Sequence, residues 1–314
     1  PIMLEELNID KDLVEASKRQ PRNLVARQIL SDMDKAIDKL QVNFANKVRI
    51  NKYAALAMKS RMALYEATFE KYHRGTGRVP GDANWPGKNK EWNKNFTINQ
   101  DDEVNFFLDQ AIDAAKKVCD AVPLSTQNNH VMNPGTVGNF NGWNPYYDMF
   151  ASPNLTKYPE VLLWREFNTD INVAHLTSNK LRGGLSSGWT RGLVESFLMK
   201  NGLPIYASGS GYHGDTTVDL AKTDRDERLQ LFVFGESNDL DIDQKSIDLI
   251  NKQRVKEGKP TITKLLFDAA TLFATDQASR DVTGYRQRKF YNYDPAMQLG
   301  QTFSDVDGQI IIRV

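Results

Sequence analysis

Three long segments with helical periodicity constrain this chain more than any other feature. In residues 23–40, 51–73 and 101–122, apolar residues recur every three or four positions, the spacing that gives a helix one apolar stripe. We expect three amphipathic helices with apolar faces made of Val25, Ile29, Met33, Ile37 and Leu40; Ala54, Ala55, Met58, Met62, Tyr65 and Phe69; and Val104, Leu108, Ile112, Ala115 and Cys119. The alanines of the second segment allow a neighbouring helix to approach closely.

Local signals mark where regular structure begins and ends. Acidic residues at 101–103 suit a helix N-terminus, and Pro123 stops the third segment. Residues 109–113 (DQAID) echo residues 34–38 (DKAID), which suggests paired helices of the tetratricopeptide kind. The pattern further predicts short helices at 159–167, 191–200 and 241–257, irregular zones at 75–95, 127–153 and 176–214, and an irregular or weakly stranded tail from 261.

Composition excludes some classes of function. Lys plus Arg and Asp plus Glu both total 40, so no global field attracts nucleic acid or an anionic membrane. No run approaches the ~20 apolar residues of a membrane span, and residues 1–8 carry no signal-peptide pattern. The missing initiator Met and the apolar last residues suggest a piece of a longer protein. The single cysteine, Cys119, excludes an internal disulfide, and we expect a buried structural thiol.

Six blocks, in order along the chain, resemble the SusD/RagB family of outer-membrane glycan-binding lipoproteins. The block at 50–65 (INKYAALAMKSRMALY) is similar to that family's Ala-rich signature helix. The others are residues 23–40, 158–164 (YPEVLLW), 190–205 with its LVESF run, 225–229 (RDERL, where Glu227 replaces the usual Pro) and 284–290 (GYRQRKF). The lipidated cysteine, the first helices and the closing helix pair of the family have no counterpart in this sequence.

The resemblance implies a mainly α fold in which tetratricopeptide-like helix pairs support a large, irregular, loop-rich face. We expect one SusD-like domain over residues 1–314, incomplete at both ends. Its helical scaffold would comprise residues 21–73 and 101–123, and its ligand side residues 127–314. The family role is to capture oligosaccharides or polysaccharides at the cell surface and pass them to a SusC-like TonB-dependent transporter. Membrane contact would then run only through a lipid anchor that this sequence lacks.

A glycan binder needs flat aromatic rings in polar loops, because sugar C–H faces pack on rings while hydroxyls bond to neighbouring amides. Residues 139–147 (NFNGWNPYY) have this character. The candidate ligand-binding residues are Trp189, Trp143, Tyr146, Tyr147, Trp85 and Tyr212. Each could instead anchor its loop to the scaffold, and Trp92 shares this ambiguity. Trp164, in an apolar run, is expected in the core.

The sequence contains no recognisable catalytic or metal-binding motif, so we expect neither a catalytic residue nor a cofactor. His73, His130, His175 and His213 lack paired ligand spacing. The acidic run at 239–243 resembles the start of a calcium loop, but Gln244 stands where that loop needs Gly.

The favoured hypothesis is therefore glycan binding without catalysis. Two alternatives stay open. One is a helical glycoside hydrolase using a carboxylate pair, with Asp170, Asp215 and Glu166 as the first suspects. The other is a helix-repeat scaffold that holds protein partners.

Overall fold

The computed structural model describes residues 2, 17–42, 46–126, 130, 144–168, 170, 172–175, 188–235, 248, 251–252, 255–256, 258, 261, 283–290 and 307–314. It is mainly helical, with little strand and with loop-rich regions, as the sequence predicts. No tetratricopeptide repeat is identified among the described residues. The chain divides into two compact units: unit 1 holds residues 1–124, 159–164 and 311–314, and unit 2 holds residues 125–158 and 165–310.

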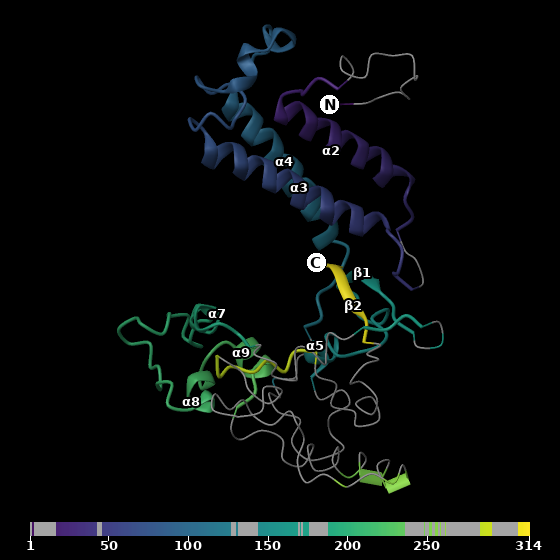
Figure 1. Ribbon diagram of the computed structural model, residues 1–314, viewed down its shortest axis with the longest axis vertical. Coiled ribbons are helices and arrows are strands. Elements are labelled where there is room, and N and C mark those ends of the chain that lie inside the picture. The colour runs from purple at the N-terminus through teal and green to yellow at the C-terminus, as the bar shows by residue number, and fades with distance from the viewer. Residues whose placement is uncertain are drawn as a thin grey trace. The chain divides into compact units, whose positions relative to one another are not determined.

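Unit 1 is built on three helices, α2 (Arg22–Lys39), α3 (Lys52–His73) and α4 (Gln100–Cys119). Helix α3 packs against both α2 and α4 (Figure 1). Asn51 caps α3 by accepting from the Ala54 amide at 3.0 Å, and Asn99 caps α4 by accepting from the Asp101 amide at 3.1 Å. The three helices lie within two residues of their predicted bounds, apart from the C-terminal end of α4, three residues short of its predicted end.

The buried faces of these helices differ from the predicted stripes. Small residues make the contacts: Ala63 and Ala67 of α3 and Ala114 of α4 are 0% exposed, and Phe107 fills the space beside them. Side chains that the periodicity placed inside instead face solvent, namely Ile29, Met58, Tyr65 and Ile112. The reason is geometric: α3 lies between two helices, so its contact faces must be narrow enough for close approach, and large side chains are turned outward.

Cys119 corrects a further expectation. The predicted buried thiol is exposed. The inward face of α4 runs through Ala111, Ala114 and Val118, and Cys119 follows Val118 by one residue, which rotates it about 100° away from the core.

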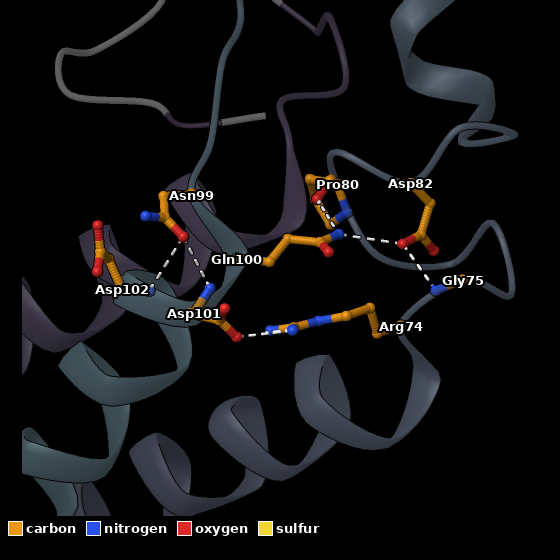
Figure 2. Close-up of polar contacts among 8 residues, drawn as sticks. All are labelled: Arg74, Gly75, Pro80, Asp82, Asn99, Gln100, Asp101 and Asp102. Atoms are coloured by element: carbon orange, nitrogen blue, oxygen red, sulfur yellow. Dashed lines mark hydrogen bonds and ion pairs between the residues drawn. The ribbon is translucent and has the colours of Figure 1, made fainter.

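The turn between α3 and α4 is irregular, as predicted, and is held by one buried carboxylate. Asp82 accepts hydrogen bonds from the Gly75 amide at 2.8 Å and from the Gln100 side chain at 3.0 Å (Figure 2). The Gly77 amide also donates to Asp82, at 2.9 Å. Burial works to raise the pKa of Asp82, but these donors outweigh it and the pKa lies below its ordinary value. Two short 3₁₀ helices follow, η1 (Pro86–Asn89) and η2 (Glu91–Asn93).

The helix predicted at residues 159–167 is wrong, because the middle of this segment forms a strand. Strand β1 (Val161–Arg165) pairs with β2 (Gln309–Arg313), and its first four residues are buried. A short apolar run is compatible with either a buried strand or a buried helix, and pairing with a distant strand decides between them. Trp164 is in the core as expected, 2% exposed, and its indole N–H donates to the Asn46 carbonyl at 2.7 Å.

Unit 2 contains short helices: α5 (Pro145–Asp148), α7 (Arg191–Ser196), α8 (Val218–Lys222) and α9 (Glu227–Phe232). Helix α7 covers the first part of the helix predicted at 191–200. Most of the predicted helix at 241–257 lies outside the described residues. Across the described chain, no helix is both long and apolar enough to cross a membrane.

Two fully buried arginines join the short helices of unit 2. Arg225 donates to the carbonyls of Val194 at 2.6 Å, Phe197 at 2.8 Å and Ala221 at 2.9 Å. Arg288 donates to the Leu231 carbonyl at 2.6 Å. The last carbonyls of a helix have no partner within it, so each guanidinium satisfies groups that would otherwise be buried without a donor.

Candidate functional site

Trp189 lies at the centre of an aromatic cluster in unit 2. Its ring stacks on Phe197 with centroids 5.6 Å apart and planes 5° apart. Both rings, with Tyr285, pack against a small core of Val194, Leu229 and Val233. We call Trp189, Phe197, Tyr212 and Tyr285 the α7 aromatic cluster, and all four side chains are half-buried.

Hydrogen bonds fix the orientation of Trp189. Its indole N–H donates to Oε1 of Gln287 at 3.1 Å, and its amide donates to the Tyr285 carbonyl at 2.9 Å. Gly188 is required by the same packing, since a Cβ there would lie 2.2 Å from the Thr283 hydroxyl. The Trp189 ring is therefore held at its edge and stacked on Phe197, which suits a preformed ligand platform.

Charged groups act on the phenols of Tyr212 and Tyr285. Arg191 pairs with Glu195 at 2.5 Å and with Asp215 at 3.0 Å. Burial raises the pKa of both Tyr212 and Tyr285, and Asp215 raises both further, while Arg191 and Arg225 act in the opposite direction. The two phenols thus share the same charged neighbours and stay protonated at neutral pH. They can donate or accept hydrogen bonds with ligand hydroxyls.

The structure brings two of the predicted candidates, Trp189 and Tyr212, into this common environment. Sequence reasoning did not single out Phe197, Tyr285, Gln287 or Arg191 as candidates. A signal was present for all four, because Arg191 and Phe197 belong to the family-like block at 190–205, and Tyr285 and Gln287 to the block at 284–290. Sequence reasoning also missed Tyr206, which is 85% exposed in the turn after α7.

Tyr146 and Tyr147 belong to a different cluster. Tyr147 is 1% exposed, stacks on Phe232 at 5.7 Å, and donates its hydroxyl to the Arg288 carbonyl at 2.5 Å. Its ring therefore serves the scaffold, and the ligand-binding assignment of Tyr147 is corrected. Tyr146 is half-buried and lies 5.5 Å from Phe150, edge to face, which places it at the border of the same core.

The tryptophans of the α3–α4 turn lie in unit 1. Trp85 is half-buried, 5.5 Å from Phe96, and its ring occupies the position where a Cβ on Gly87 would be. Trp92 is 42% exposed, donates to the Arg19 carbonyl at 3.1 Å, and has the ammonium of Lys18 5.5 Å from its ring. The packing of Trp85 favours the loop-pinning role, whereas Trp92 keeps an accessible face. Trp143 lies outside the described residues.

The acidic residues of the described chain form no metal site, and the suspected carboxylates are exposed or paired with an arginine. Among the described residues, no group of three or more His, Cys, Asp or Glu side chains could hold a metal ion. Glu166 and Asp170 are exposed, and Asp215 is the partner of Arg191. Burial and neighbouring glutamates raise the pKa of Glu70 on α3 to about 8. Glu70 is 0% exposed, so no substrate reaches it as a general acid.

Comparison with known proteins returned no relative. No family model matches the chain, and neither a curated protein nor a solved structure matches it.

Proposed function

We propose that this chain binds carbohydrate without transforming it, through the α7 aromatic cluster of unit 2. In this proposal it is a SusD/RagB-like surface protein with a tetratricopeptide-like helical part, anchored to the outer membrane by a lipid. Bound oligosaccharide or polysaccharide would pass to a SusC-like TonB-dependent transporter. The resemblance of the six sequence blocks suggests this role.

The observation that carries the proposal is the setting of Trp189. A half-buried indole, stacked on Phe197 and hydrogen-bonded to Gln287, is already fixed in one orientation. Little side-chain entropy is therefore lost when a ligand binds to the ring. The phenols of Tyr212 and Tyr285 and the Arg191–Asp215 pair supply hydroxyl-bonding groups nearby. Sugars need this combination, since their C–H faces pack on rings while their hydroxyls form hydrogen bonds.

A protein partner is supported by a second observation on the same unit. Leu193 of α7, Leu198 and Leu203 in the turn after it, and Leu220 of α8 are exposed by 45%, 44%, 37% and 39%. Exposed apolar side chains are available for contact with a partner, and they mark a contact site where they form one patch. These side chains fit a protein surface such as that of the proposed transporter.

The test of carbohydrate binding is retention of the full chain on affinity gels. The gels would contain soluble α-glucan, β-glucan, xylan, mannan or pectin. Retention on at least one gel, weakened about tenfold or more by Trp189→Ala at a temperature where circular dichroism shows the variant to be folded, is the expected result. Tyr72→Ala is the matched control, because Tyr72 is 73% exposed on α3 in unit 1 and has no proposed role.

Retention that Trp189→Ala leaves unchanged would remove the site from the α7 aromatic cluster. New reducing ends released from a retained polysaccharide would instead favour a hydrolase, and loss of that release on changing one carboxylate would establish it.

A further inference from the structure

The contact between α2, α3 and α4 contains buried charged side chains that lie outside the predicted apolar stripes. Glu66, Glu70 and Glu103 are 1%, 0% and 6% exposed, and Asn23 is 3% exposed. We call these four residues, with Arg22 and Arg27, the buried acidic cluster. It lies wholly within unit 1.

Two of the three glutamates are fully paired. Arg22 donates from Nε to Oε1 of Glu66 at 2.8 Å and from a terminal nitrogen to Oε2 at 2.7 Å. Arg27 makes the same two-pronged contact with Glu103, at 2.8 and 2.7 Å, and the Asn23 amide adds a bond to Glu103 at 3.1 Å. Both guanidiniums also lie over aromatic rings, Arg22 over Phe69 at 3.9 Å and Arg27 over Phe106 at 3.6 Å. Such forked pairs are the arrangement in which a buried carboxylate keeps its charge.

Glu70 differs from Glu66 and Glu103 in its hydrogen bonding. Within the described structure, neither of its carboxyl oxygens has a hydrogen-bond partner, and the carbonyl oxygen of the Asn23 side chain also lacks a donor. A buried ionised carboxylate without donors costs several kcal/mol, on the order of the penalty for any unpaired buried ion. A protonated carboxyl avoids that cost and supplies one O–H donor to a cluster that is short of donors.

The charges that act on Glu70 come from all three helices. Glu66 lies on its own helix, Glu103 on α4, and Arg22 and Arg27 on α2. Burial is the largest influence on the pKa of Glu70, followed by repulsion from Glu66 and Glu103, and the two arginines offset only part of it. With a neutral Glu70, two cations face two anions. An ionised Glu70 would leave one excess negative charge in the contact.

We propose that the contact between α2, α3 and α4 is a proton-binding site, in which Glu70 holds one proton in the folded protein at neutral pH and thereby couples the stability of unit 1 to pH. The geometry supports this proposal independently of any titration. Arg22 is paired with Glu66 and Arg27 with Glu103, so neither arginine donates a hydrogen bond to Glu70.

The direction of the coupling follows from the pKa of Glu70 in each state. Unfolding returns this pKa from about 8 to its ordinary value of 4.5. The folded state binds the proton more tightly, so its contribution to stability is complete below about pH 4.5. That contribution falls as the pH rises from 4.5, the unfolded pKa, to about 8, the folded pKa. Above the folded pKa it is fully lost.

The direct test is a carbon-13 NMR titration of the glutamate side-chain carboxyls in the full chain between about pH 4 and 10, bracketing the ordinary and folded pKa. One carboxyl resonance that titrates well above pH 6 and is missing from Glu70→Gln is the expected result. A wild-type spectrum in which every glutamate titrates below about pH 6 overturns the proposal without needing any variant.

A stability comparison then measures the consequence. Glu70→Gln keeps the shape and removes the ionisation, so we expect its denaturation midpoint to fall less than that of the wild type between about pH 5 and 8. Glu66→Gln is the matched control one helical turn away, equally buried but paired with Arg22. It should lower the midpoint at neutral pH, because it removes the charge that Arg22 needs. Equal pH slopes for wild type and Glu70→Gln would contradict the proposal.

Discussion

Each unit is stabilised internally by a different kind of contact. Unit 1 relies on three long helices whose narrow alanine faces meet closely and whose buried charges are mostly paired side chain to side chain. The short helices described in unit 2 span four to six residues, and its buried Arg225 and Arg288 bond to backbone carbonyls instead. Long helices satisfy their own backbone, whereas short ones leave most terminal groups unpaired. Unit 2 therefore depends on a few side chains that reach across the sequence.

The largest predicted effect comes from removing such a side chain. Arg225→Met removes three hydrogen bonds, to the carbonyls of Val194, Phe197 and Ala221, at a cost of at least about 3 kcal/mol. Hydrogen exchange should show lost protection in α7 and α8, with α3 unchanged. Arg228→Met is the control, because Arg228 is exposed and pairs with the side chain of Asp226 rather than with backbone carbonyls of the short helices. Uniform loss of protection in both units would mean that they do not differ in this way.

A second prediction tests the narrow helix faces of unit 1. Ala67→Leu adds three carbons where the side chain is 0% exposed, and overpacking should cost about 1–3 kcal/mol in chemical denaturation. Met58→Leu lies on the exposed side of the same helix and should change stability by less than about 0.5 kcal/mol. If both variants were neutral, the close contact of α3 with its neighbours would be wrong.

A third prediction concerns the turn between α3 and α4. Asp82→Asn weakens the charge-assisted bonds from the Gly75 and Gly77 amides, with an expected loss of about 1–2 kcal/mol at neutral pH. The pKa of Asp82 is lowered in the fold, so its contribution is present above the unfolded pKa and is lost as the pH falls through the folded pKa. The gap between wild type and variant should therefore shrink in acid. A gap that stays constant down to about pH 2 would contradict this role.

The smallest effect is expected at Cys119. Because the thiol is exposed on α4, Cys119→Ser should change the free energy of unfolding by less than about 0.5 kcal/mol. The native protein should also react with a thiol reagent without added denaturant. Protection of the thiol until the protein unfolds would restore the buried role that the sequence predicts.

The sequence predicted the long helices well because their periodicity, caps and stop signals are local. It misjudged which faces are buried, since Glu66 and Glu103 look like solvent-facing residues until the fold pairs them with Arg22 and Arg27 of another helix. Strand β1 was missed for the same reason, as its partner β2 lies far along the chain. In the candidate site, Trp189 and Tyr212 could be singled out by residue type. Their surroundings could not, because Gln287 and Tyr285 are brought in by non-local contacts.

The central functional claim is that the Trp189 ring contacts carbohydrate. The most direct measurement is the indole N–H spectrum of the full chain, assigned with Trp189→Phe, during titration with fragments of whichever polysaccharide retains the protein. A selective shift of the Trp189 resonance, with that of the buried Trp164 unchanged, is the predicted result. Saturable binding of the fragment with no change at Trp189 would contradict the claim.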